Sequence, residues 1–103
     1  MTELEKKFFR EMKEIYYRAD KEIGYRATRF LQMLSEMGGV VTAISLVSKP
    51  GSTDGFIKLW ENRRLDLSVE ALVLKEEYKE LFSEDIRNIC ANRLKEYGYI
   101  SEK

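Results

Sequence analysis

Apolar side chains recur at steps of three and four residues along the beginning of the chain. The positions that share this spacing are Leu4, Phe8, Met12, Ile15, Tyr16, Ala19 and Ile23. Such spacing places side chains on one face of an α-helix, because the helix completes a turn every 3.6 residues. The sequence therefore predicts one long amphipathic helix over residues 2–23, about 33 Å in length.

The following segments continue in shorter helical patterns that end at glycine. Gly24 interrupts the first pattern, either as a turn or as a kink. A second helix is expected over 27–37 and is ended by Gly38-Gly39, since glycine readily takes the left-handed conformation that closes a helix. Residues 40–47 are apolar on nearly every side and are expected to form a short buried helix. A strand is the less favoured alternative, because no nearby segment offers a pairing partner.

The second half of the chain is punctuated by turn and capping residues. The only proline lies in the turn 49–52, after which Ser52 or Thr53 can cap a helix that carries Phe56, Leu59 and Trp60 on one face. Further helix starts are expected at Asp66 or Ser68 and at Ser83, with a break near Lys75 and a stop at Gly98. The sequence thus predicts an all-α fold: a compact single domain of five to six helices over residues 1–103, with 100–103 frayed.

Residue types that carry most enzyme chemistry are nearly missing. The 103 residues include no histidine and a single cysteine, Cys90, which is expected to pack as a small hydrophobe. Histidine is the residue most often used for general acid-base catalysis and is a common zinc ligand. We therefore expect a non-enzymatic protein with no catalytic residue, cofactor or metal. The enzyme alternative would need Asp54, Glu61, Asp66 or Tyr25 to converge in one pocket.

Charge and hydropathy exclude further classes of protein. Lys and Arg number 18 and so do Asp and Glu, giving a formal net charge of zero, which argues against a dedicated nucleic-acid binder. No apolar run approaches the roughly 20 residues needed to span a bilayer, and the N-terminus lacks the apolar segment of a signal peptide. We expect a cytoplasmic protein that makes no membrane contact.

A basic strip is the first candidate binding surface. It lies on the first predicted helix opposite the apolar face, and its members are Lys6, Arg10, Lys13, Tyr17 and Lys21. Glu3, Glu14 and Asp20 flank the strip and can neutralise it through pairs three or four residues apart, in which case the strip is only solvated surface. Contact with an acidic protein or with nucleic acid is the functional alternative.

Arginines beside aromatic residues form the second candidate. These partner-binding candidates are Tyr25, Arg26, Arg29, Trp60, Arg63 and Arg64. In one interpretation the arginines pair internally, with Asp66 or Glu70, and Trp60 packs in the core. In the other they form a patch that docks a partner, because arginine and aromatic residues dominate interface hot spots.

Several sequence blocks occur in one order along the chain. They are GYRATRFLQML, GGVVTA and STDGFIKLWENRRLDLSVEALVLKEEYKELF. This arrangement resembles a widespread family of short uncharacterised bacterial and phage proteins with GY-ATRFL, GG-TA, S-DGF-LWE and RLDL-VEALVL blocks. The resemblance covers residues 8–97 and implies a bacterial or phage origin and a stand-alone domain. It assigns no catalytic or binding residue.

A full apolar core without catalytic residues favours an interaction domain. We expect it to bind a protein partner, as a regulator or inhibitor of a larger machine. The alternative is a DNA-associated, helix-turn-helix-like module in which residues 40–47 and 53–63 present Lys58, Arg63 and Arg64 to a groove, although the turn between them is longer than usual. Formation of a homodimer is a further alternative, since aromatic side chains could cover a symmetric interface. Those side chains are Tyr17, Tyr97 and Tyr99.

Overall fold

Helices account for all the regular structure in the computed structural model, which describes residues 2–99. Six α-helices and two short 3₁₀ helices lie in this part of the chain, and no strand does. In chain order they are α1 (Glu3–Ile23), α2 (Thr28–Met37), α3 (Gly39–Val47), α4 (Asp54–Glu61), η1 (Leu65–Leu67), α5 (Val69–Val73), η2 (Glu76–Leu81) and α6 (Glu84–Glu96). The predicted all-α class and long first helix are confirmed. The predicted fraying of 100–103 lies outside the described residues.

Helix α1 begins and ends as its sequence indicates. The Thr2 hydroxyl accepts the Glu5 N–H while the Glu5 carboxylate accepts the Thr2 N–H, which forms a capping box. Gly24 ends the helix with φ +71°, and its N–H reaches the Ala19 and Asp20 carbonyls. Gly24 is therefore a helix terminator, and a connection over 24–27 leads into α2.

Helix α3 packs closely under α1 because Gly39 has no side chain. A Cβ at Gly39 would lie 3.0 Å from Cδ2 of Phe8 and 3.2 Å from Cα of Phe9. The predicted helix over 40–47 is confirmed, with Thr42, Ala43 and Val47 buried. This close approach needs a residue without a side chain at the first position of α3.

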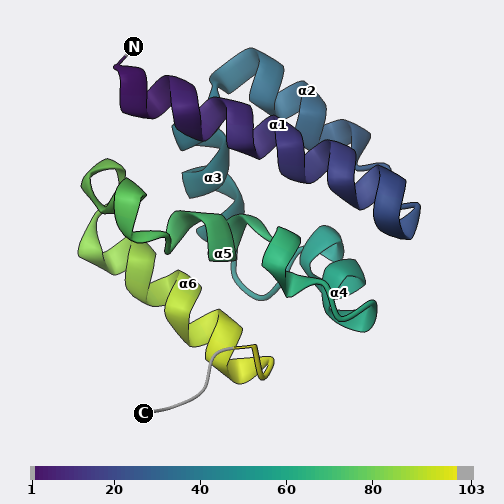
Figure 1. The fold of residues 1–103 in the computed structure, drawn as a ribbon. Helices are drawn as coiled ribbons and strands as arrows, with labels where there is room; N and C mark the ends of the chain where they lie inside the picture. The colour runs from purple at the N-terminus through teal and green to yellow at the C-terminus, as the bar shows by residue number, and fades with distance from the viewer. Residues whose placement is uncertain (1, 100–103) are drawn as a thin grey trace.

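The helices form layers around an interior that runs the length of the molecule. Figure 1 shows α1 and α2 side by side along one side, α6 along the other, and α5 between them, with α3 passing from the first layer toward the second and α4 at one end. The main core cluster consists of Phe8, Met12, Leu34, Ala43, Val47, Leu72, Val73, Tyr78, Phe82 and Cys90. A second cluster, nearer α4, consists of Ala19, Phe56, Leu59, Leu65, Leu67 and Leu94.

Side-chain caps fix where the later helices start. Hydroxyl groups of Thr53, Ser68 and Ser83 accept backbone N–H groups three residues ahead, at the beginnings of α4, α5 and α6. Thr53 rather than Ser52, and Ser68 rather than Asp66, are thus the caps. Within residues 2–99, none of the helices combines the length and the apolar character required to cross a lipid bilayer.

Candidate binding surfaces

The predicted arginine and aromatic residues do not gather into one patch. Tyr25, Arg26 and Arg29 lie at the start of α2 and line a cleft. Trp60 and Arg63 line a separate groove beyond α4. Arg64 lines neither, because its guanidinium is held by carboxylates of the chain itself. The structure therefore contains two surfaces and one internal ion-pair network where the sequence suggested one docking site.

A cleft of about 520 Å³ opens between the α1–α2 connection, α2, the α3–α4 loop and α4. We call it the α2–α4 cleft. Its inner wall is apolar, and the side chains there include Phe30, Met33, Leu46, Phe56 and Leu59. This volume lies in the range of pockets that bury a small ligand or one or two side chains of a partner.

Tyr25 forms one edge of the α2–α4 cleft by lying against α4. A Cβ at Gly55 would be 3.2 Å from the Tyr25 hydroxyl oxygen, so the ring rests on the bare backbone at the start of α4. Burial raises the pKa of Tyr25, and the nearby Asp54 carboxylate adds to the rise. The phenol is therefore a neutral hydrogen-bond donor beside the cleft at physiological pH.

The rim of the α2–α4 cleft carries exposed charge of both signs, and its cations Arg26, Arg29 and Lys49 outnumber the carboxylate of Asp54. Arg26 lies 3.4 Å from the Asp20 carboxylate in a solvent-exposed pair, whereas Arg29 and Lys49 have no ion pair within residues 2–99. Arg29 can thus offer its planar set of N–H donors to a carboxylate brought by a ligand.

Behind this cleft lies a buried ion pair. Arg93 of α6 and Glu70 of α5 are 2.8 Å apart with side chains 10% and 5% exposed. The same guanidinium donates to the carbonyls of Val47 and Lys49, at 3.3 and 3.2 Å, where α3 ends. Glu70 is therefore the partner of Arg93 and not of Arg63 or Arg64. One signal was available: Arg93 occupies the apolar stripe of the last helix, where a charged residue needs a partner.

Arg64 joins the end of α1 to η1. It makes two parallel hydrogen bonds of 3.0 Å to Asp66, as one interpretation of the sequence expected, and a third bond of 2.5 Å to Glu22. Glu22 also accepts from Arg18 at 2.9 Å. Hydrogen bonds from Arg18 and then Arg64 lower the pKa of Glu22 to about 2, and Arg64 likewise holds the pKa of Asp66 below its ordinary value.

This network predicts an acid-dependent contribution to stability. The pKa of Glu22 is depressed in the folded state, so its contribution is present above the ordinary value of 4.5 and is lost as pH falls toward about 2. We expect Glu22→Gln to flatten the fall of the urea midpoint over this pH window relative to the unchanged protein. Because the ion pairs of Glu22 with Arg18 and Arg64 are partly exposed to solvent, 1 M NaCl should reduce the difference in urea midpoint between Glu22→Gln and the unchanged protein.

The matched control for this prediction is Glu96→Gln, which removes an exposed carboxylate without an ion pair near the end of α6. Its midpoint should follow the unchanged protein at every pH. Identical acid profiles for Glu22→Gln and Glu96→Gln would contradict the role given to Arg18 and Arg64.

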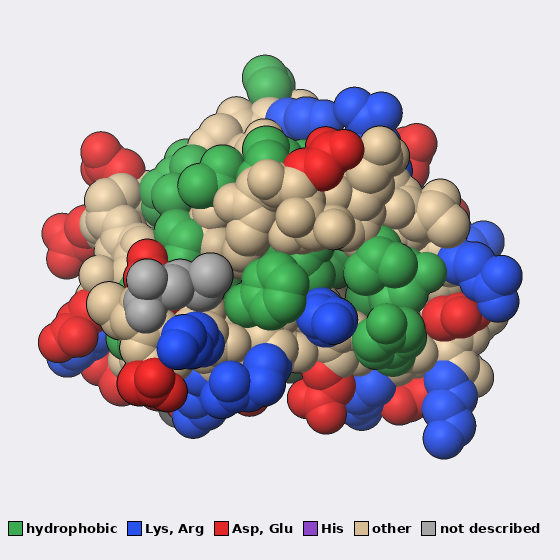
Figure 2. Space-filling model, turned by 90° about the horizontal axis from the view of Figure 1, so that it is seen from above, with side chains coloured by type: hydrophobic (Ala, Val, Ile, Leu, Met, Phe, Trp, Pro, Cys, Tyr) green, Lys and Arg blue, Asp and Glu red, His purple; other side chains and the backbone are tan. Residues whose placement is uncertain are grey.

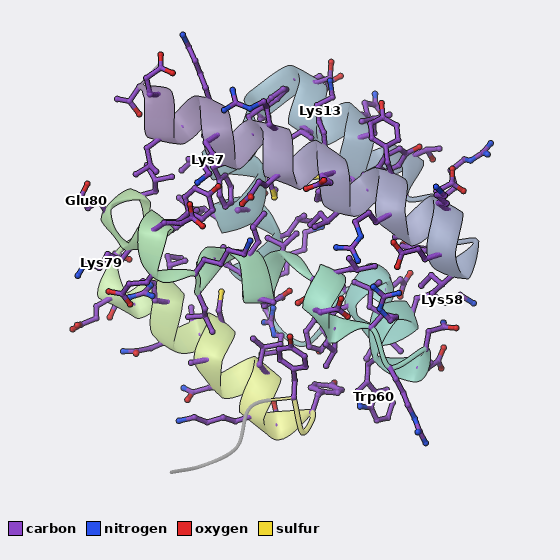
Figure 3. The ribbon with its side chains drawn as sticks, in the orientation of Figure 1. Lys7, Lys13, Lys58, Trp60, Lys79 and Glu80 are labelled. Atoms are coloured by element: carbon purple, nitrogen blue, oxygen red, sulfur yellow. The ribbon has the colours of Figure 1, made fainter. Side chains whose placement is uncertain are left out.

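A second groove, also of about 520 Å³, lies between the C-terminal ends of α4 and α6. We call it the aromatic groove. It is lined by Trp60, Glu61, Arg63, Leu65, Tyr97, Gly98 and Tyr99. Trp60 is 44% exposed and projects outward from α4 in Figure 3, so the interpretation that places it in the core is wrong. Its ring packs edge to face against Tyr97, with centroids 5.3 Å apart, and the rest of its surface is open to solvent.

The basic strip of α1 surrounds an exposed aromatic ring. Tyr17 is 55% exposed and lies in a shallow groove of about 350 Å³ with Arg10, Lys13 and Lys21. Figure 2, which views the molecule from the α1 and α2 side, shows Lys and Arg side chains interspersed with hydrophobic ones. The strip therefore mixes charge with apolar surface.

Flanking acids neutralise only part of the basic strip. Lys6 pairs with Glu3 at 3.5 Å, but Asp20 pairs with Arg26, and Glu14 has no ion pair within residues 2–99. Lys13 lies over the Phe9 ring at 5.7 Å. The expected neutralisation by Glu3, Glu14 and Asp20 thus occurs at Lys6 alone.

The groups named for an enzyme are dispersed over the molecule. Tyr25 and Asp54 line the α2–α4 cleft, Glu61 lines the aromatic groove, and Asp66 belongs to the Arg64 network. Cys90 is fully buried in the main core, where burial raises the pKa of its thiol to about 12. Residues 2–99 contain no group of three or more His, Cys, Asp or Glu side chains able to hold a metal ion.

Comparisons of the chain with protein-family models, with curated proteins and with solved structures gave no match.

Proposed function

We propose that the protein is a non-enzymatic interaction domain that binds a segment of a partner protein in the α2–α4 cleft. The observation that carries this proposal is a cleft with an apolar wall and an unpaired arginine, Arg29, on its rim. In this function the domain would serve as a regulator or inhibitor of a larger machine. A cytoplasmic location is part of the proposal.

The chemistry of the cleft defines the segment that fits it. The apolar wall favours one or two large aliphatic or aromatic side chains, which leave water on binding. Arg29 and Arg26 at the rim favour a neighbouring Asp or Glu, since a guanidinium pairs with a carboxylate through two parallel hydrogen bonds. We therefore infer a partner segment in which a bulky apolar residue is followed closely by an acidic one.

A protein partner is favoured over DNA because too few basic side chains on the candidate DNA-binding surface are free of ion pairs within the chain. Of the three side chains assigned to a DNA groove, Arg64 is already held by Asp66 and Glu22. Lys58 and Arg63 remain, and two cations give a much weaker attraction to phosphates than the six to ten contacts of many DNA-binding proteins.

Selection from a displayed library of random peptides tests the proposal directly. We expect enrichment of peptides that combine a large apolar residue with a nearby Asp or Glu, and binding of these peptides should weaken about tenfold or more in Arg29→Glu. Circular dichroism checks that the variant is folded, which is expected because Arg29 is exposed.

The matched control is Arg63→Glu, which reverses an exposed arginine on the other side of α4. Selected peptides should bind it as well as they bind the unchanged protein. Failure to enrich any peptide, or equal binding by Arg29→Glu, would overturn the proposal. Salt-sensitive binding of double-stranded DNA in place of peptides would favour nucleic acid as the partner and would also overturn it.

A further inference from the structure

We propose that Arg93 and Tyr97 are positioning residues for the α2–α4 cleft. They hold the loop between α3 and α4, residues 48–53, which forms one edge of the cleft. Neither Arg93 nor Tyr97 lines the cleft itself. The inference rests on the binding function proposed for the cleft, and it adds that affinity there depends on two residues that do not touch the bound segment.

The loop between α3 and α4 has little backbone structure of its own. Lys49, Pro50, Ser52 and Thr53 line the cleft. Within residues 2–99, no backbone–backbone hydrogen bond involves any of the residues 49–52. A segment with so few internal bonds opens easily unless side chains from elsewhere hold it. The contacts that do so come from α6 (Glu84–Glu96) and from Tyr97, which directly follows it.

Arg93 holds the beginning of the loop. Its guanidinium donates to the carbonyls of Val47 and Lys49, at 3.3 and 3.2 Å, and to the Glu70 carboxylate at 2.8 Å. The Arg93 side chain is 10% exposed, so little water competes for these bonds. Glu70 belongs to α5 and lines the cleft. A single guanidinium therefore fixes the loop relative to another part of the cleft wall.

Tyr97 holds the far part of the loop. Its hydroxyl accepts a 3.0 Å hydrogen bond from the Ser52 hydroxyl. The Tyr97 ring packs edge to face against the buried Phe56, with centroids 4.9 Å apart and planes at 77°. Phe56 belongs to α4 and lines the cleft. The Tyr97 hydroxyl therefore lies at a fixed place beside α4, and it fixes Ser52 there as well.

A held loop prepares the cleft for binding before a partner segment arrives. Lys49 and Ser52, the two points of contact, lie on either side of Pro50-Gly51. If the loop moved freely, binding would have to order it, and that cost would be taken from the affinity. The apparent affinity would fall in proportion to the fraction of molecules in which the loop is in place.

NMR relaxation of the backbone amides tests this holding in the protein alone. In the unchanged protein, order parameters of Gly51 and Ser52 should be about 0.85, the value of a rigid backbone. Tyr97→Phe keeps the ring and removes the hydroxyl. Arg93→Lys keeps a positive charge beside Glu70 but removes the fork of N–H donors that reaches the loop. We expect both variants to lower the order parameters of the loop toward about 0.6.

The peptides enriched on the unchanged protein test the consequence for binding. Their affinity should weaken about fivefold in Tyr97→Phe, because one hydrogen bond to the loop is lost. It should weaken further in Arg93→Lys, because two bonds to loop carbonyls are lost. Urea unfolding confirms that each variant is folded, and Tyr97→Phe decides the matter by itself if Arg93→Lys does not fold.

Two control variants make the same chemical changes at groups that do not reach the loop. Tyr78→Phe removes a hydroxyl that donates to the Glu11 carboxylate at 2.6 Å. Arg87→Lys changes another arginine of α6, whose guanidinium donates to the Leu74 carbonyl at 3.1 Å. Any loss of stability in these controls should leave both the order parameters of the loop and the peptide affinity unchanged.

Unchanged order parameters in Tyr97→Phe and Arg93→Lys would overturn the inference, whether or not any peptide is found. Lowered order parameters with unchanged peptide affinity would overturn it too, since the order of the loop would then have no effect on binding. Equal changes in Tyr78→Phe and Arg87→Lys would mean that general packing is the cause, which also overturns it. Failure to enrich any peptide counts against the proposed function, while the order parameters still decide whether α6 and Tyr97 hold the loop.

Discussion

Replacing Arg93 with methionine should lower the free energy of unfolding by about 3–5 kcal/mol, as expected when one partner of a buried ion pair is removed. The cause is the Glu70 carboxylate, which is 5% exposed and would remain charged and buried without its partner. The substitution also removes two hydrogen bonds to the carbonyls of Val47 and Lys49, where the α3–α4 loop begins. Urea unfolding at pH 7, followed by circular dichroism, measures the loss.

The double variant Glu70→Met with Arg93→Met separates the unpaired charge from ordinary packing. Methionine at both positions fills similar volume without burying charge, so the pair of substitutions should recover most of the stability lost by Arg93→Met alone. An Arg93→Met variant that loses under about 1 kcal/mol, the range of an exposed pair, would show that this ion pair is solvated in solution. A double variant as unstable as the single one would show that the hydrogen bonds to the loop carry the effect.

Phe8→Ala should lower the free energy of unfolding by about 3–5 kcal/mol, through lost burial and the cavity left behind. Phe8 is fully buried and meets Tyr78 and Phe82 edge to face, with centroids 5.0 and 5.2 Å apart. It also fills the space that the bare Gly39 leaves beside α1. The substitution therefore removes contacts among α1, α3 and η2 at once. Thermal or urea unfolding measures the loss of stability.

The neighbouring residue provides the control for this prediction. Phe9→Ala removes the same number of atoms from a ring that is only partly buried and lies under Lys13. Its cost should be less than half that of Phe8→Ala, since less apolar surface returns to water. Equal losses from the two variants would mean that α1 does not present Phe8 to the core as described.

Local patterns were sufficient to predict the α-helices. The stripe from Leu4 to Ile23 depends only on the pitch of an α-helix, and the ends of α1 and α2 depend on glycines with positive φ at 24 and 38. Hydroxyl caps act on N–H groups three residues ahead, so they too are visible along the chain. The break expected near Lys75 is found at the start of η2, although the 3₁₀ geometry there has no distinct sequence signature.

The binding surfaces were less predictable because they depend on how helices pack. Tyr25 and Trp60 both flank arginines in the sequence, yet α4 comes between them: its Gly55 lies against Tyr25 and its Trp60 faces Tyr97. The partner of Glu70 lies 23 residues away on α6. The place of Arg93 in the apolar stripe of the last helix indicates that it needs a partner, but no local spacing identifies Glu70 as that partner, since the choice is made when α5 and α6 pack together.

The buried position of Cys90 makes its alkylation a measure of how often helix α6 opens. Its side chain is fully enclosed on α6, and burial raises the pKa of its thiol to about 12, so the native state holds almost no reactive thiolate. Alkylating reagents can reach the sulfur only while α6 is detached from the main core cluster. The rate of alkylation therefore reports on local opening of α6. A ligand that holds α6 in place would lower this rate without contacting the sulfur.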